Sequence, residues 1–330
     1  MRGRWSYALQ SFQLIVQGQD NRFANNRQFN NRSGNGELQW NWALRSVLTG
    51  QLGGDYSRSL VNFASTRDYR PDYLEGTGYF ATLVYHLGPQ WRIKLSGKRN
   101  ESNHSLDARA TDNFIGTTAT GGVEYETPSR NVFGWDYRYT EGRFPDDPGA
   151  AGQLSVRAYD EQGASGRLKY AVGAKTVLEG SAGYLRRDYP QDSASDFSGD
   201  VWRVGVRWSP TVKVLVSVSG WRELRANQDV ESDYFVSTGG GVNLGWSLTE
   251  SVQLSGRWSR DSQRYLLASG QVVGANSRRD TLENLQVGVV YQPREWLELN
   301  VSFANEQRDS NRDFLAYDDQ ITSAGVKLSF

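Results

Sequence analysis

The feature that most constrains this chain is an alternation of apolar and polar residues with a period of two. It is clearest in the last ten residues, 321–330. There Val326, Leu328 and Phe330 fall on one face, and Lys327 falls on the other. Because successive side chains of a β-strand point to opposite sides of a sheet, this pattern predicts a strand with one apolar face and one polar face.

The same alternation recurs along the whole chain. Clear examples are the segments 38–44, 91–95, 133–139, 202–208, 285–291 and 297–303. The segments are long and regular, which favours extended antiparallel strands over the shorter strands of ordinary sandwiches. A soluble β-sandwich or β-helix is the alternative, and it would have to turn these apolar faces toward a core.

Composition favours a membrane barrel over that soluble alternative. Hydrophobic residues make up 38% of the chain and the mean hydropathy is -0.63, yet there are 11 Trp, 17 Tyr and 13 Phe. In a transmembrane barrel only every second strand residue faces lipid, and aromatic residues form girdles at both membrane interfaces. No apolar run approaches the roughly 18 residues of a transmembrane helix, so the sequence predicts none.

Two kinds of connection alternate between the strand segments. Short turns lie at 44–48, 87–91, 127–131, 172–176, 209–211, 247–251 and 292–296. Longer polar loops lie near 18–35, 66–72, 102–110, 144–157, 189–197, 226–232, 265–279 and 308–316. Seven turns and eight loops predict about sixteen strands, and single-chain bacterial barrels have even strand numbers. We therefore predict an all-β fold, a transmembrane antiparallel up-and-down β-barrel. It would be formed by residues 1–330 as one domain, with both termini on the periplasmic, short-turn side.

Charge and cysteine content narrow the possible partners. The formal net charge is zero, with 37 basic and 37 acidic residues, whereas a nucleic-acid-binding domain is typically basic. No nucleic-acid partner is therefore expected. The absence of cysteine fits an oxidising compartment. Residues 1–4 contain no apolar signal segment, so we expect a signal peptide to have been removed.

The polar strand faces would line a water-filled pore if such a barrel closes. The predicted basic pore-lining residues are Arg92, Lys94, Arg138, Arg167, Lys169, Arg187, Arg203, Arg207, Arg257 and Lys327. A ladder of Arg and Lys along a wet pore selects anionic solutes. Acidic residues share these faces, so an ion pair across the wall is the alternative role for each basic residue. Phe80 and Trp221 are predicted on the same faces, where an aromatic ring would stack on a sugar or narrow the pore.

The glycine runs have a structural interpretation, and the histidines raise the question of catalysis. Gly121–Gly122 and Gly239–Gly241 lie inside strand segments and predict bends in the wall. His104 stands near Ser105 and Asp107 in an external loop, but a catalytic triad depends on geometry that proximity in sequence does not supply. We expect no enzymatic activity, no metal and no cofactor.

Several segments resemble the EpsL-type outer-membrane β-barrels encoded in exopolysaccharide biosynthesis operons. These segments are 70–80, 159–166, 202–221 and 325–330. The resemblance implies an outer-membrane exit for a polysaccharide made at the inner membrane. It implies as partners the polysaccharide itself, outer-membrane lipid and lipopolysaccharide, and a periplasmic polysaccharide export or co-polymerase protein. In outer-membrane barrels a terminal aromatic such as Phe330 is also the signal for the barrel assembly machinery.

Three functions remain open at this point. The first is an outer-membrane pore that exports an exopolysaccharide, with an anionic polymer as one candidate. The second is a general or anion-selective diffusion porin for small solutes. The third is a barrel enzyme or adhesin that acts through its external loops. All three place the chain in the bacterial outer membrane.

Overall fold

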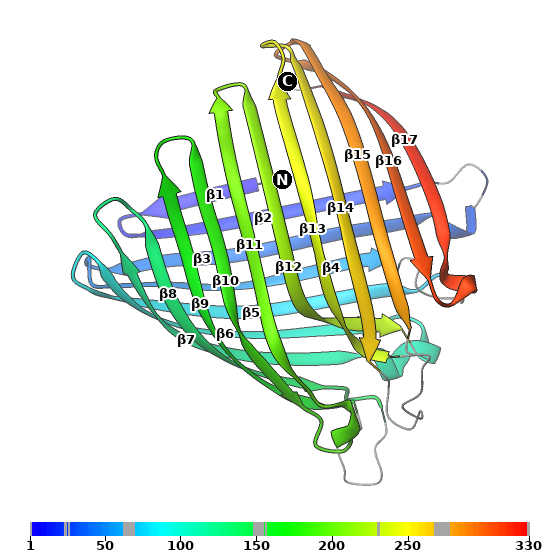
Figure 1. Cartoon of the computed structure of the whole chain (residues 1–330), viewed down its shortest axis with the longest axis horizontal. Coiled ribbons are helices and arrows are strands. Elements are labelled where there is room, and N and C mark those ends of the chain that lie inside the picture. The colour runs from blue at the N-terminus through cyan, green and yellow to red at the C-terminus, as the bar shows by residue number, and fades with distance from the viewer. Residues whose placement is uncertain are drawn as a thin grey trace. The chain divides into compact units, whose positions relative to one another are not determined.

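Seventeen antiparallel strands make up almost all of the part of the chain that the structure describes (Figure 1). The computed structural model describes residues 2–22, 25, 27–61, 70–147, 155, 157–229, 232–266 and 278–328. The chain divides into two compact units. Unit 1 comprises Met1–Ser129, Phe133–Gly166 and Tyr184–Gly199, and unit 2 comprises Arg130–Val132, Arg167–Gly183 and Asp200–Phe330.

Unit 1 is a sheet in which each strand pairs with the next one along the chain. Its strands are β1 (Arg2–Tyr7), β2 (Gln10–Asn21), β3 (Asn31–Leu44), β4 (Leu48–Leu60), β5 (Tyr73–Leu87), β6 (Trp91–His104), β7 (Phe114–Glu126) and β8 (Val132–Arg143). It also contains the loop-side parts of β9 (Tyr159–Val172) and β10 (Thr176–Asp188). Short 3-10 turns, η1 (Arg27–Phe29), η3 (Asp107–Asp112) and η4 (Ser193–Ser195), lie in its loops.

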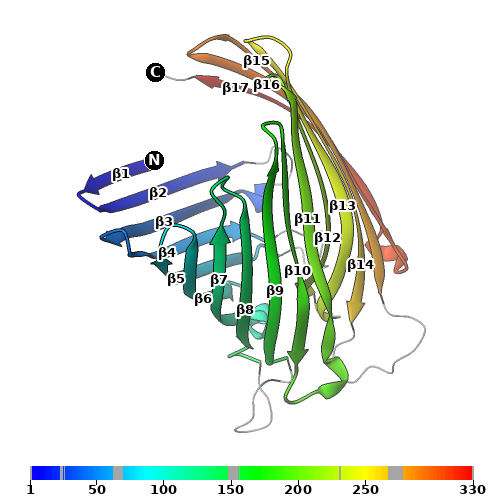
Figure 2. The ribbon, with the colours of Figure 1, turned by 60° about the vertical axis from the view of Figure 1, so that its left-hand side comes forward.

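Unit 2 repeats the same up-and-down order, and Figure 2 shows its strands side by side in chain order. Its strands are β11 (Phe197–Thr211), β12 (Val214–Asp229), β13 (Ser232–Ser247), β14 (Val252–Leu266), β15 (Arg279–Arg294), β16 (Leu297–Ser310) and β17 (Tyr317–Leu328). One 3-10 turn, η5 (Asp313–Leu315), precedes β17. No helix among the described residues is long and apolar enough to cross a bilayer.

The strand count exceeds the predicted number by one because the sequence conceals a turn near the N-terminus. Ala8 has a φ of 51° and lies between β1 and β2. Glycine or asparagine would have signalled this turn, and alanine does not. Arg2 pairs with Ile15 near the middle of β2, so β1 begins within the sheet rather than at the short-turn side. The other end of the chain matches the prediction, because Leu328 pairs with Leu297 directly after a short turn.

Glycine and proline shape four of the short turns, whereas Arg45 and Arg130 supply the positive φ in two others. Gly88 and Gly173 adopt φ values of 80° and 68°, which glycine reaches without strain. Pro210 and Pro293 lie within the register shifts that follow Trp208 and Tyr291. Proline cannot donate a ladder hydrogen bond, so a bulge near the strand end is the place where a sheet tolerates it.

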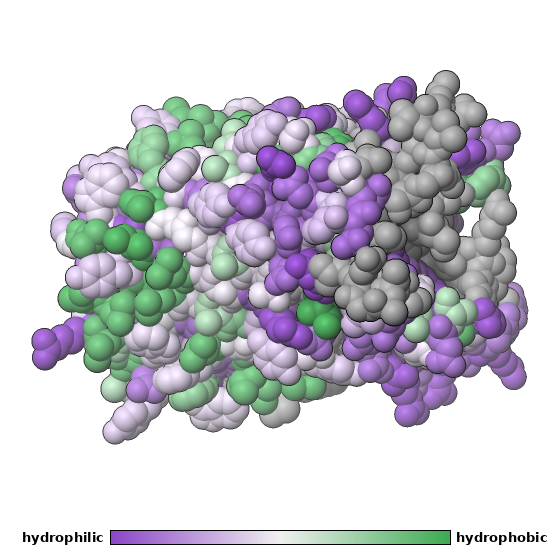
Figure 3. All heavy atoms as spheres, turned by 90° about the horizontal axis from the view of Figure 1, so that it is seen from below, coloured by the Kyte–Doolittle hydropathy of each residue, from purple (hydrophilic) through white to green (hydrophobic). Residues whose placement is uncertain are grey.

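Each unit has one apolar face that is exposed rather than covered. Trp135 in unit 1 is 62% exposed and Val326 in unit 2 is 67% exposed. Figure 3 shows hydrophobic atoms gathered toward the side on which Figure 1 shows the short turns of β3–β8. Hydrophilic atoms gather toward the loop side. Large exposed apolar side chains that alternate with polar ones fit a surface that contacts lipid.

Candidate functional site: the polar faces of the two units

All ten predicted basic residues lie on the polar face of their strands. Unit 1 holds Arg92, Lys94, Arg138 and Arg187, and unit 2 holds Arg167, Lys169, Arg203, Arg207, Arg257 and Lys327. Period two was sufficient to place them, because the direction of a strand side chain depends only on local backbone geometry. Their contacts, described next, depend on strand register.

Glu124 on β7 is shared by two of these cations. It forms one ion pair with Arg92 at 3.1 Å and another with Lys94, and both of these cations lie on β6. Arg92 also contacts Glu126. Glu124 is only 4% exposed, and the strand register sets it directly opposite Arg92. A buried carboxylate needs such partners, since burial without them penalises its charge.

Glu161 on β9 forms a second shared carboxylate in unit 1. Its two oxygens accept from Arg138 at 2.9 Å and from Arg187 at 2.6 Å. The Arg187 guanidinium also lies 3.9 Å from the ring centroid of Tyr159. The side chains of Arg187 and Glu161 are 7% and 6% exposed, so this pair is almost entirely removed from water. We refer to Arg92, Lys94, Glu124, Glu126, Arg138, Glu161 and Arg187 as the ion-pair lattice.

The basic residues of unit 2 are paired more loosely. Lys169 lies 3.8 Å from Glu179, and Lys327 lies 3.7 Å from Glu298. Arg203 makes the tightest contact, at 2.6 Å from Glu223. Arg257 donates to the side-chain oxygen of Asn243 at 2.8 Å.

At least seven of the ten predicted basic residues therefore have a carboxylate partner. They are Arg92, Lys94, Arg138, Lys169, Arg187, Arg203 and Lys327. A paired cation presents little net charge to a passing solute. The polar faces are thus a poorer anion-selective ladder than the basic residues alone suggest.

A second surface in unit 1 is rich in uncharged amides and also carries two facing carboxylates, Glu37 and Asp55. Cross-strand partners on the polar face of β2–β4 include Gln13 with Gln39, Gln17 with Asn35, and Asn41 with Gln51. We call these six residues the amide wall. Gln39 donates to Asn41 at 2.8 Å. The side chains of the other four make no hydrogen bond to another described residue.

A groove of about 530 Å³ opens on this face, near the short turns of β1–β5. Polar side chains that line it include Arg4, Ser11, Asn41, Gln51 and Thr82. Amide groups carry both donors and acceptors, so the groove can hydrogen-bond hydroxyl groups in either sense. Sequence reasoning missed this wall, although its signal was visible as Asn35, Gln39 and Asn41 on one parity of the segment 35–41, with Glu37 between them.

The two predicted polar-face aromatics both lie across a glycine. A Cβ added to Gly53 would come within 2.3 Å of the Phe80 ring in unit 1. One added to Gly239 would come within 2.8 Å of the Trp221 ring in unit 2. The register runs through Gly239–Gly241 without a shift, so no β-bulge lies at these glycines. Here glycine makes room for a neighbouring ring.

Trp221 is further held by a chain of buried polar groups. Its indole N–H donates to Ser237 at 3.0 Å and to Asp261 at 3.2 Å. Ser237 in turn donates to the same Asp261 oxygen at 2.6 Å, and Gln263 donates to the other oxygen at 2.9 Å. These contacts join β12, β13 and β14 across the polar face.

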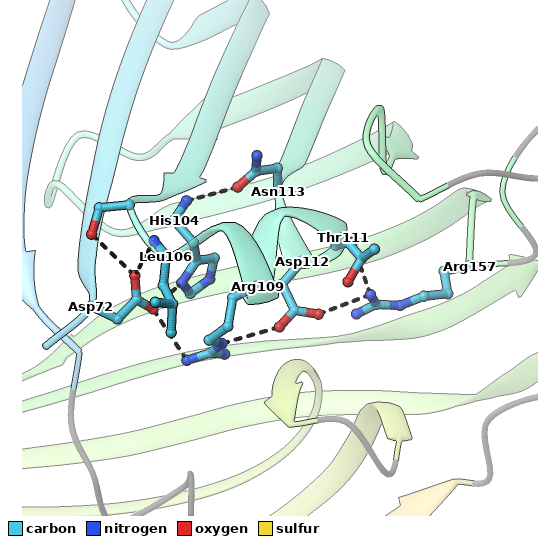
Figure 4. A network of polar contacts seen from close by, with 9 residues as sticks. Asp72, His104, Leu106, Arg109, Thr111, Asp112, Asn113 and Arg157 are labelled. Atoms are coloured by element: carbon cyan, nitrogen blue, oxygen red, sulfur yellow. Dashed lines mark hydrogen bonds and ion pairs between the residues drawn. The ribbon is translucent and has the colours of Figure 1, made fainter. Parts of the chain in front are cut away.

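The loops of unit 1 contain another polar network, which includes His104 (Figure 4). The His104 Nδ1 lies 2.6 Å from Asp72, and Arg109 lies 3.5 Å from the same carboxylate oxygen. Arg109 reaches Asp112 at 3.2 Å, and Asp112 pairs with Arg157 at 3.0 Å. The network thereby ties η3 to the residues that precede β5 and β9.

The partner of His104 is Asp72 and not the nearby Asp107 that the sequence suggested. Ser105 donates to Asp72 at 3.4 Å. The hydroxyl and the imidazole therefore meet the same carboxylate and do not form a nucleophile–base pair. The described contacts are those of a structural tie between loops.

Phe330, the predicted assembly signal, lies outside the described residues.

Comparison with known proteins identifies the fold. No protein-family model and no curated protein matches the sequence. Among solved structures, the apoprotein form of the FrpB iron transporter (F5-1 variant) of Neisseria meningitidis matches with a TM-score of 0.57 and 11% identity. That match covers 93% of this chain and 58% of FrpB. The copper transporter OprC matches with a TM-score of 0.56 and 12% identity, covering 94% of this chain and 58% of OprC.

A third match is the siderophore receptor PirA from Acinetobacter baumannii. Its TM-score is 0.52 and its identity is 10%, and the match covers 96% of this chain and 68% of PirA. This chain thus spans only 58% of the length of OprC and FrpB. At such identities the likeness is one of fold. The chain has the all-β, up-and-down fold of bacterial outer-membrane β-barrel proteins, as the sequence predicted.

Proposed function

We propose that the chain forms an outer-membrane pore that exports an exopolysaccharide with little net charge. The observation that carries this proposal is the chemistry of the polar faces. Their charges are largely satisfied by one another, while the amide wall keeps unused donors and acceptors. A surface of this kind suits a hydroxyl-rich solute, because it offers hydrogen bonds in both senses without a strong field.

Two further lines support outer-membrane transport in a general way. The matched structures bear the names of a copper transporter, an iron transporter and a siderophore receptor. The resemblance of segments such as 202–221 to EpsL-type barrels points more narrowly to polysaccharide export. On this proposal residues 1–330 close into a single barrel, whose apolar face contacts lipid and lipopolysaccharide.

The proposed partners follow from the same function. The barrel assembly machinery would recognise the terminal Phe330, and a periplasmic export or co-polymerase protein would deliver the polymer to the short-turn side. The pore wall would conduct passively. The driving force would come from synthesis of the polymer or from the periplasmic partner.

The test is single-channel conductance of the purified protein in a planar bilayer. We expect an open current that neutral and acidic oligosaccharides block to a similar extent, because the wall favours hydroxyl groups over charge. A large current that no oligosaccharide affects would identify a general diffusion porin. The absence of current would contradict an open pore. Block by acidic oligosaccharides alone would restore the anion-selective alternative.

A further inference from the structure

Trp221 is an aromatic residue on a predominantly polar surface. Its position is fixed by its two neighbouring strands and by the hydrogen bonds of its indole N–H. The register sets it between Arg203 on β11 and Gly239 on β13. The nearest ring carbon, Cζ2, would lie 2.8 Å from a Cβ at Gly239, so the indole extends over the backbone of β13. The same Cβ would also come within 2.4 Å of the backbone oxygen of Arg260, so both the ring and the adjacent strand require glycine here.

The indole N–H is anchored by groups that water hardly reaches. Ser237 is 0% exposed and Asp261 is 8% exposed, and both accept from Trp221 Nε1. Asp261 is also bonded by Ser237 and Gln263, and Gln263 accepts from the Tyr265 hydroxyl at 2.8 Å. An anchor of this kind removes rotamer freedom before any ligand arrives.

The rest of the indole is half-buried, and charged hydrogen-bonding groups stand beside it. The Arg203 guanidinium lies 5.8 Å from the ring centroid and is bonded to Glu223. Glu223 also pairs with Arg225 at 3.2 Å. The side chains of Arg203 and Arg225 are 54% and 40% exposed, so their remaining N–H groups can reach a ligand above the ring.

We propose that Trp221 is a preformed stacking platform for a pyranose ring, with Arg203, Arg225 and Glu223 as the polar groups that bind its hydroxyls. A sugar has an apolar C–H face and a polar rim. A fixed aromatic surface with a few convergent polar groups is complementary to both features. This inference rests on the proposed polysaccharide function and assigns one of its binding subsites.

The test is binding of two neutral probes, maltohexaose and cellohexaose, to the detergent-solubilised full chain, measured by saturation-transfer NMR and titration calorimetry. We expect Trp221→Ala to weaken binding of the responsive probe about tenfold, as truncation of a central aromatic contact does. Trp221→Phe keeps a ring and should lose less. The matched control is Trp258→Ala. Trp258 lies on β14, two strands from Trp221, but its side chain is on the apolar face. Its substitution should leave binding unchanged.

Two results would overturn the platform: no binding of either probe to the wild-type chain, or equal affinities for wild type and Trp221→Ala. Circular dichroism on each variant confirms that the strands are retained. Conductance of the same preparations separates this inference from the pore itself. An open channel with no Trp221-dependent binding refutes the platform alone, whereas Trp221-dependent binding without current supports the platform and refutes the pore.

Discussion

The amide wall and the ion-pair lattice both lie on the polar face of unit 1, but they differ in how far their polar side chains are paired within the protein. In the lattice, Glu124 and Glu161 each bind two cations, and little hydrogen-bonding capacity remains on either carboxylate. In the wall, most amides have no side-chain partner among the described residues. The comparison teaches that the charges of this face serve the fold first, while the uncharged residues are the ones available to a solute.

The largest expected effect comes from breaking the lattice at Glu161. Glu161→Gln would leave the buried Arg187 without its carboxylate, which should lower the free energy of unfolding by about 3–5 kcal/mol. Urea unfolding of the protein in detergent micelles, followed by circular dichroism, measures this loss.

The matched control for that change is Glu179→Gln. Its partner Lys169 lies 3.8 Å away and both side chains are about half exposed, at 59% and 48%. An exposed pair of this kind contributes less than about 1 kcal/mol. Equal losses in the two variants would show that burial does not distinguish the lattice from surface pairs.

A smaller effect is expected from breaking the amide wall at Gln51. Gln51→Leu keeps a similar volume but removes a donor and an acceptor from the groove. Removing one hydrogen bond to a ligand costs about 1 kcal/mol, so the residence time of a blocking oligosaccharide should fall about fivefold. Single-channel recordings give this residence time directly.

The stability of Gln51→Leu should stay within about 0.5 kcal/mol of wild type, since the amide has no partner to lose among the described residues. A variant that blocks normally but unfolds more easily would mean that the wall, like the lattice, serves mainly the fold.

The smallest effect is expected from exposing lattice charge to the solute at Glu124. Glu124→Gln leaves Lys94 without its carboxylate, while Arg92 retains Glu126. The added positive charge should raise the preference for chloride over potassium about twofold, a modest change because salt screens it. An unchanged preference would indicate that this part of the face is remote from the conduction path. The preference for chloride over potassium is measured as the zero-current potential in a salt gradient.

The sequence was sufficient to predict which strand face each residue shares, but not which side chains it contacts there. Alternation assigned Arg92, Lys94 and Arg203 to the polar face, as the register does, because side-chain direction is local to a strand. Their partners depend on register across a hairpin, and the loop between β6 and β7 fixes that register without a recognisable motif. The Trp221–Asp261 bond was hidden for the same reason, because it joins residues two strands apart. The turn at Ala8 was missed because its positive φ falls on a residue that rarely adopts one.

The central claim, that the charges of the polar faces neutralise one another, is tested most directly by the ion selectivity of the wild-type channel. The measurement is the zero-current potential across a planar bilayer under a gradient of potassium chloride. We predict a chloride-to-potassium permeability ratio within about threefold of unity, as expected for a wall of paired charges and amides. A channel that prefers chloride by about tenfold or more would mean that the basic residues act as an open ladder, and would contradict the claim.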